Sequence, residues 1–313
     1  MLRPTSSPLV RRALLVAGVS LTSLLTASCG TFTENKTAVS VNGSDLSVET
    51  LEDYVKQFDK IQQIPIADGV VELEGVRGLL GAFVRENVYT RFLDSYGTPL
   101  TDEQVQAKRE EIGDDVFAEL TPELANMIIR LNAGATAIQE FEAPSDEDIE
   151  KTYKDEPSLT GALCVNHIVT KTKAKAAKVL AKLDAGADWK TLAGQYSLED
   201  NAGETGGALV GEGPDGKAIP CQSILQFQET FDPLFVAGVL EAEAGVPYGP
   251  VRSSFGYHVI YVQPFDEVAD TVLELVKSQP GPLMATGLVS NTEVLVDPAY
   301  GVWSPAVAAI VAN

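Results

Sequence analysis

The spacing of apolar residues changes at Pro144, and this change constrains the fold more than any other feature of the chain. Before it, apolar residues recur every three or four positions, as in amphipathic helices. After it, segments with strand character alternate with short helical ones. We therefore expect a helical unit followed by a mixed unit, which makes an α+β protein. The helical segments begin after Ser47, run from Val76 to Tyr96, open at a Thr101–Gln104 capping box, and extend from Pro122 to Ile138.

Short strands are expected near the start of the helical unit, inside the mixed unit and near the end of the chain. A strand from Ala38 to Val41 meets a turn at Asn42 and Gly43, a strong turn signal. After Pro144, the capped segment SDEDIEKTYK restarts the chain as a helix. The later elements are a strand at Ala162–Thr170, helices at Ala174–Leu183 and Trp189–Tyr196, a strand at Gly256–Val262, a helix at Glu267–Lys277, and a Pro/Gly-rich segment leading to a strand near Glu293–Val296.

The first 28 residues resemble an export signal. Three arginines precede a run of about 16 apolar residues, which is shorter than the ~20 that a membrane-spanning helix needs. The run ends in small residues followed by Cys29, as in lipoproteins, although Leu25 stands one place too early for the usual cleavage box. We expect an exported chain that is held by lipid on Cys29 at the outer face of a bacterial membrane, with plain secretion as the alternative.

The chain is acidic, with a formal net charge of −21, and residues 30–159 carry 27 acidic and 11 basic side chains. This balance argues against nucleic-acid binding, which needs a basic surface. It fits either a well-solvated surface or a partner with basic segments.

Three cysteines and two histidines are the residues most able to bind metal or to react. If Cys29 is acylated, Cys164 and Cys221 form an even pair in an oxidising compartment, which favours a disulfide. Closing that loop would stabilise the fold by about 4 kcal/mol. The same residues do not have the CxxC or HxxxH spacing of a zinc site. We therefore expect neither a metal nor another cofactor.

Both histidines precede two β-branched residues, in NHIVT (residues 166–170) and YHVIY (residues 257–261). This shared pattern has two interpretations. His167 and His258 are separate core residues, or two strands bring their imidazoles to one site.

Six ordered blocks in residues 163–264 resemble the parvulin-type peptidyl-prolyl isomerases. They are the HI strand, a helix, GADWKTLAGQYS at Gly186–Ser197, the glycine pair before Leu209, FDP at Phe231, and GPVRSSFGYHVIYV at Gly249–Val262. The start SVNGSDLSVETL is similar to the N-terminal domain of extracytoplasmic foldases of the SurA and PrsA type. The resemblance implies that His167 and His258 face each other beneath the catalytic cleft.

The resemblance also implies roles for other residues. Leu209, Phe227 and Phe231 would hold the proline ring, and Ser253 would lie near the second histidine. A carboxylate is expected two residues after the Y-S serine, at Glu199, or at Asp200 if the loop is shifted by one. This chain departs from the family at Glu199, where Asp is common, at Ala208, where Asp usually follows the glycine pair, and in the long loop of residues 210–230.

These observations divide the chain into a signal peptide (1–28), a helical chaperone domain (29–157), a parvulin-type domain (158–264) and a C-terminal helix and strand that pack on the chaperone domain (265–313). The expected function is an extracytoplasmic peptidyl-prolyl cis/trans isomerase that acts on exported, incompletely folded polypeptides containing X-Pro bonds. The alternative is a holding chaperone whose parvulin domain is weak or inactive. A solute-binding lipoprotein would have two α/β lobes, which the long helical half does not fit.

Lipid attachment at Cys29 can be tested directly. We expect metabolic labelling with a fatty acid to mark the wild-type protein and not Cys29→Ala, because the thiol is the only acceptor in the proposed cleavage box. Equal labelling of both proteins, or an unmodified mature N-terminus, would indicate plain secretion instead.

Overall fold

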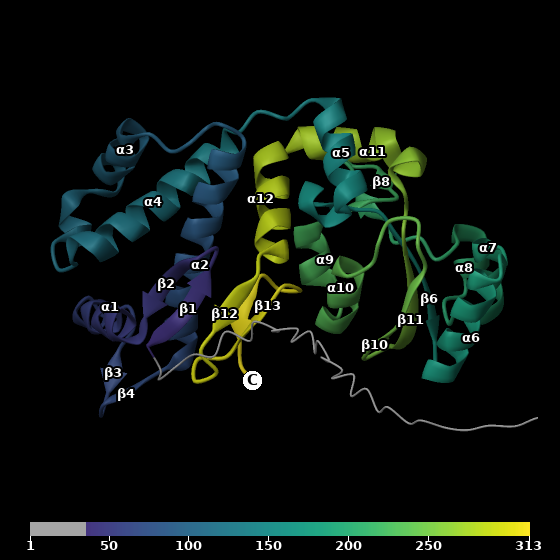
Figure 1. Ribbon diagram of the computed structural model, residues 1–313, viewed down its shortest axis with the longest axis horizontal. Coiled ribbons are helices and arrows are strands. Elements are labelled where there is room, and N and C mark those ends of the chain that lie inside the picture. Colours follow the sequence, from purple (N-terminus) through teal and green to yellow (C-terminus); the bar gives the residue numbers. More distant parts are fainter. Residues whose placement is uncertain (1–35) are drawn as a thin grey trace, which may run out of the picture.

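The computed structural model describes residues 36–313, so the predicted signal peptide and Cys29 lie outside the described residues. The chain forms two lobes on either side of helix α12 (Figure 1). One lobe contains the N-terminal helices, and the other contains a small antiparallel sheet flanked by helices. The predicted α+β class is confirmed. In residues 36–313, no helix has the length and apolar character required to span a membrane.

The first lobe forms where the capping signals predict. Asn42 and Gly43 have φ values of 52° and 81° in the turn between the first two strands. Ser47 and Thr121 cap α1 and α4, and Thr101 forms a complete capping box with Gln104. The elements are β1 (Thr37–Val41), β2 (Ser44–Ser47), α1 (Val48–Lys60), β3 (Ile66–Ala67), β4 (Val70–Val71), α2 (Leu73–Ser95), α3 (Asp102–Ile112), η1 (Asp114–Phe117) and α4 (Pro122–Gln139).

The end of the chain returns to this lobe. Strand β12 pairs with β1 in antiparallel register, with Val39 opposite Val296, and so completes a three-stranded sheet in the order β12-β1-β2. Helix α11 packs on α5, while α12 contacts α2, α4 and η2. The elements between the two lobes and at the end of the chain are α5 (Asp146–Asp155), η2 (Pro157–Thr160), α11 (Phe265–Ser278), α12 (Pro280–Asn291), β12 (Val294–Val296), β13 (Val302–Ser304) and β14 (Ala309–Val311).

The Pro/Gly-rich segment before β12 is helix α12, which corrects the sequence-based interpretation. Pro280 occupies the first helical position, where the missing N–H costs nothing. The glycines allow close packing: a Cβ at Gly281 would overlap the carbonyl oxygen of Ile138, and one at Gly287 would approach that of Ser158. Gly and Pro therefore mark a tightly packed helix here instead of a loop.

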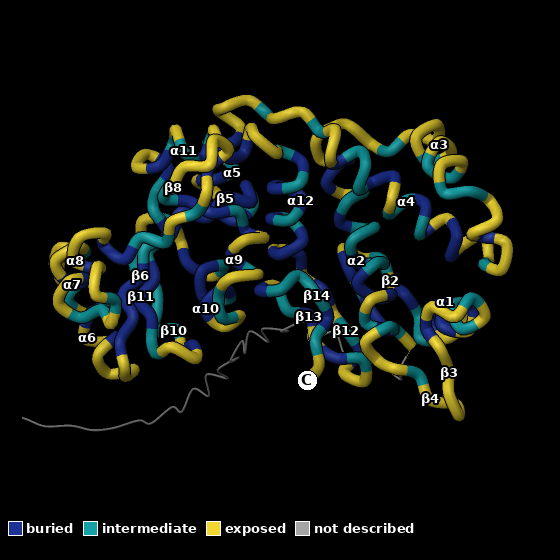
Figure 2. Tube along the Cα trace, turned by 180° about the vertical axis from the view of Figure 1, so that it is seen from behind, coloured by how far each residue is buried: buried dark blue, intermediate teal, exposed yellow. Residues whose placement is uncertain are grey.

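The second lobe is built on the antiparallel sheet β10-β11-β6. Helices α6 and α7 cover one face and α10 covers part of the other. The middle of β6 and β11 is buried, whereas the outer surfaces of α6, α7 and α8 are exposed (Figure 2). The elements are β5 (Ala162–Leu163), β6 (Val165–Thr170), α6 (Lys173–Asp184), α7 (Trp189–Tyr196), α8 (Ala202–Thr205), β7 (Gly211–Glu212), β8 (Ala218–Ile219), β9 (Gln222–Ser223), α9 (Ile224–Thr230), α10 (Pro233–Leu240), β10 (Tyr248–Ser253) and β11 (Gly256–Val262).

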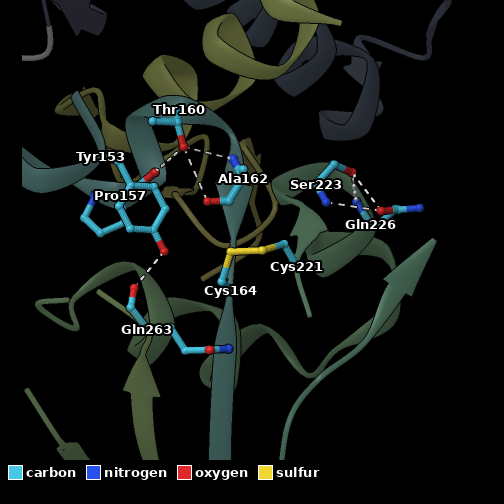
Figure 3. Close-up of a disulfide and its surroundings, with 9 residues drawn as sticks. All are labelled: Tyr153, Pro157, Thr160, Ala162, Cys164, Cys221, Ser223, Gln226 and Gln263. Atoms are coloured by element: carbon cyan, nitrogen blue, oxygen red, sulfur yellow. Dashed lines mark hydrogen bonds between the residues drawn. A yellow bond between two sulfur atoms is a disulfide. The ribbon is translucent and has the colours of Figure 1, made fainter. Parts of the chain in front are cut away.

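The single strand predicted at 162–170 is divided at Cys164. Residues before it pair with β9, and residues after it pair with β11, so the chain changes partner at this position. The structure joins Cys164 to Cys221 by a disulfide, next to the hydrogen bond from Tyr153 Oη to the carbonyl oxygen of Gln263 (Figure 3). Both cysteines are fully buried in a cluster shared with α5, α11 and α12.

The contact at Gly281 predicts a large loss of stability in Gly281→Ala. The added methyl group would displace α12 from α4, and overpacking of this kind costs about 1–3 kcal/mol. Gly78→Ala is the matched control, because this helical glycine is exposed and has free space around it, so the free energy of unfolding should stay equal or rise by about 0.5–1 kcal/mol. Denaturant unfolding measures both. Similar stabilities for the two variants would contradict the close packing of α12.

Candidate functional site

The two histidines meet because of the register of β6 and β11. Ile260 pairs with His167, and His258 pairs with Val169, so the histidines are diagonal neighbours on one face of the sheet. Their Nδ1 atoms are 3.0 Å apart and the rings are nearly parallel. Both side chains are buried, and we call them the histidine pair. The sequence alone left two interpretations, and the structure places both imidazoles at one site.

A polar group lies at each end of the histidine pair. Ser253 Oγ is 2.7 Å from His258 Nε2 and is buried with it. At the other end, Glu199 Oε2 is 3.1 Å from His167 Nε2, but it lies off the direction of the ring N–H. We regard this contact as electrostatic and weakly directional. Asp200, the alternative carboxylate, is exposed.

The contacts define a consistent set of proton positions. Contact with the His167 ring holds the pKa of Glu199 below its usual value, against the opposing effect of burial, so Glu199 is ionised and can only accept. A proton on Nε2 of His167 can face this carboxylate while its Nδ1 accepts. His258 then donates from its own Nδ1, and its Nε2 accepts from the Ser253 hydroxyl. The line of contacts therefore runs from Ser253 through the two rings to Glu199.

Burial and the neighbouring His167 ring lower the pKa of His258 from 6.5 to about 4, and the carboxylates of Glu199 and Asp232 only partly oppose them. A neutral His258 is therefore expected across the physiological range. The unfolded chain binds this proton more readily than the folded protein does. The contribution of His258 to the free energy of unfolding is therefore at its full value above pH 6.5, and it decreases as the pH falls from 6.5 toward 4.

An apolar wall borders the histidine pair, and it contains the three predicted residues together with Phe235. Leu209 and Phe231 are half-buried, as a substrate surface requires, whereas Phe227 is completely buried behind them. Phe235 on α10 has its ring centroid 4.7 Å from that of His258 and 5.4 Å from that of His167, and the sequence analysis missed it. The sequence did contain a signal for Phe235: it lies four residues after Phe231, about one helical turn, in a helix that Asp232 caps.

Asp232 is a second residue that the sequence analysis missed. Its Oδ1 accepts from the backbone N–H of Leu234, which caps α10, and its Oδ2 accepts from the N–H of Ser254 in the β10–β11 turn. The bond from Ser254 is the main cause of the lowered pKa of Asp232. The carboxylate thereby holds the turn that carries Ser253 against the helix that carries Phe235. The sequence signal for Asp232 was the Asp-Pro pair before an apolar segment, which is typical of the start of a helix.

No group of three or more His, Cys, Asp or Glu side chains between Lys36 and Asn313 is arranged to hold a metal ion. The site presents an imidazole pair, a hydroxyl and a carboxylate beside aromatic side chains.

The neutral state of His258 can be measured by NMR, because the chain has only two histidines. In an acid titration, we expect the ring nitrogens of His258 to keep neutral-form shifts down to about pH 4, and a His167→Gln variant to assign the two sets of signals. An imidazole assigned to His258 that titrates near pH 6.5 in the folded protein would contradict the buried pair.

Comparison with known proteins gives the family of this domain. A family model described as a PPIC-type PPIASE domain matches residues 164–265. The chain is similar to foldase protein PrsA 3 of Bacillus cereus, with 30% identity over 43% of each chain, and to foldase protein PrsA 3 of Bacillus anthracis, with 29% identity over 57% of this chain and 54% of the relative. The matched segments thus span about half the length of these relatives.

Among solved structures, that of PrsA from Bacillus subtilis matches 82% of this chain and 91% of its own, with 16% identity and a TM-score of 0.28. At that score the overlay does not bear on how the lobes are arranged. The family match covers the sheet β10-β11-β6, both histidines and the apolar wall. Residues 164–265 are therefore a PPIC-type, or parvulin-type, peptidyl-prolyl isomerase domain, within a chain similar to the PrsA foldases.

Proposed function

We propose that this chain is an extracytoplasmic peptidyl-prolyl cis/trans isomerase that assists the folding of exported proteins. The observation that carries the proposal is the line of contacts from Ser253 through the histidine pair to Glu199, set beside half-buried apolar side chains in a parvulin-type domain. The substrates would be incompletely folded polypeptides that contain X-Pro bonds.

The reaction needs no covalent step, because rotation about the X-Pro bond crosses a barrier of ~20 kcal/mol that arises from lost amide conjugation. Leu209, Phe231 and Phe235 would hold the proline ring, with Phe227 supporting them from behind. An apolar surrounding disfavours the charge-separated resonance form of the planar amide and so favours the twisted state. We call these four residues the proline pocket.

The polar residues would fix the electrostatics of the site and exchange no proton with the substrate. The histidine pair is buried, and neutral His258 places no charge beneath the amide. Glu199 is the exception, because about a third of its side chain is exposed and its negative charge faces the cleft. A fixed carboxylate near the twisted amide favours the form in which the amide nitrogen has regained its lone pair and the carbonyl carbon its partial positive charge.

The location and domain roles belong to the same proposal. The N-terminal helices with the returning C-terminal segment would form the chaperone domain, and residues 158–264 the isomerase. Lipid on Cys29 would hold the protein at the outer face of the membrane, where the Cys164–Cys221 disulfide is stable.

A holding chaperone with a weak isomerase is the second candidate, and one feature of the site, the carboxylate of Glu199, favours it. Glu199 stands where related domains commonly have Asp, and its contact with His167 lacks hydrogen-bond alignment. A longer side chain that is only loosely held stabilises a transition state less well than a fixed one.

Paired variants separate the two functions. We expect Glu199→Gln to lower the isomerase rate on proline peptides by about tenfold, because it removes the charge and keeps the shape. His167→Ala should act in the same direction. Suppression of aggregation of an unfolded client should remain, because holding a client depends on apolar area.

Asp200→Asn is the matched control, since this neighbouring carboxylate is exposed, and its rate should equal that of the wild type. Thermal melts verify that each variant is folded. A wild-type protein that isomerises no peptide but still suppresses aggregation would exclude the enzyme and support the holding chaperone.

A further inference from the structure

The buried core of the isomerase lobe contains one residue from outside that lobe. Ala306, in the turn between β13 and β14, is 3% exposed and belongs to the same apolar cluster as Phe227 and Phe235. We call residues 304–308 the C-terminal turn. It extends from the C-terminal strands toward α9 and α10 (Figure 1). The core behind the proline pocket is therefore completed by a residue, Ala306, that lies 41 positions (306 − 265) beyond the end of the matched domain.

A hydrogen-bonded side chain fixes this contact. Gln228 directly follows Phe227 on α9, and its Nε2 donates to Ser290 Oγ of α12 at 2.9 Å and to the carbonyl oxygen of Pro305 at 3.1 Å. A glutamine amide has two N–H donors, so both bonds can form together. Ser290 is 2% exposed, and its hydroxyl would lose a partner in the interior without Gln228.

The elements that Gln228 binds are themselves anchored in the other lobe. Helix α12 packs closely on α4 and η2 through Gly281 and Gly287, and β12, which follows it, pairs with β1. The C-terminal turn lies between β13 and β14, and β14 packs on α2. Because α12 and the C-terminal turn are both packed on the first lobe, their bonds to Gln228 tie α9 to that lobe.

Helix α9 in turn defines the proline pocket. It carries Phe227, whose ring centroid is 4.7 Å from that of Phe231, and Phe231 is 5.6 Å from Phe235 beside the histidine pair. The helix ends at Thr230, and its C-cap Phe231 directly precedes Asp232, the residue that holds the β10–β11 turn. A shift of α9 would therefore displace Phe227 and Phe231, which belong to the proline pocket.

We propose that Gln228, Ser290 and the C-terminal turn are positioning residues for the proline pocket, so that the isomerase site is complete only when the C-terminal segment is docked. This inference rests on the proposed isomerase function. These residues touch no substrate, and they act by holding α9.

Two variants at one position test the proposal in the full-length protein. Gln228→Glu keeps the shape but cannot donate to Pro305, whereas Gln228→Lys has a flexible ammonium group that can donate to both acceptors. We expect Gln228→Glu to raise KM for a proline tetrapeptide roughly three- to tenfold, as the loss of one or two hydrogen bonds allows. The value of kcat should change little, because a looser pocket weakens ground state and transition state alike. Gln228→Lys should recover most of the affinity.

Glu229→Gln is the matched control on the same helix, because Glu229 is exposed, and its KM should equal that of the wild type. A purely structural role for Gln228 would instead lower the fraction of folded enzyme, which reduces the apparent kcat and leaves KM unchanged. That result, or an unchanged KM in Gln228→Glu, would overturn the proposal.

Hydrogen exchange of residues 224–231 gives a readout that needs no activity. Faster exchange in Gln228→Glu, with wild-type exchange in Gln228→Lys and Glu229→Gln, supports positioning of α9 by the C-terminal segment. Unchanged exchange in Gln228→Glu overturns it. If the wild-type protein isomerises no peptide, the proposed enzyme function fails, and exchange alone decides whether the segment positions α9.

Discussion

The antiparallel pairing of β6 with β11 is the constraint on which the rest of the site depends. It places His167 and His258 diagonally on one face and puts Ile168 opposite Val259 on the other, against α6 and α7. A slip of one residue would turn one imidazole into that second apolar core and leave the other without its partner. Both faces of the sheet are buried, so the free energy of apolar burial fixes a register that the polar contacts alone could not.

Low polarity around the histidine pair gives the polar contacts their character. Two imidazoles in contact cannot both carry charge at reasonable cost in a buried site, and His258 stays neutral while its Nδ1 contacts that of His167. The outer nitrogens of the two rings contact groups of different kinds, a buried hydroxyl at Ser253 and a partly exposed carboxylate at Glu199. The result is a line of polar groups inside an apolar region, with a carboxylate at its solvent end.

Local signals in the sequence predicted the helix starts and the turn well where a single side chain fixes the backbone conformation. Caps at Ser47, Thr101 and Thr121 and the turn at Asn42–Gly43 have direct counterparts in the structure. Helix α12 was missed because Pro and Gly have two uses: they break helices in solvent, and they also permit a helix to start and to pack closely. The hairpin β13–β14 was missed because its strands have only three residues each.

The site was predicted in part, for a similar physical reason. A family resemblance located His167, His258, Ser253 and Glu199, and the structure brings these four together. It could not show that Phe227 is buried and that Phe235 faces the histidines, because the aromatic residues of α9 and α10 have the same local pattern. Which of them reaches the site depends on how the two helices pack, and that is a long-range property.

The pairing of β1 with β12 determines the order in which the chain can complete its structure. A chain that is synthesised from its N-terminus presents β1 and β2 first, while the strand that covers the free edge of β1 is close to the end. All the segments of the isomerase sheet emerge before β12 does. The first lobe thus keeps an open strand edge throughout synthesis and closes last, a long-range contact of the kind that slows folding. During that interval, β1 offers unpaired backbone N–H and C=O groups to any other extended segment.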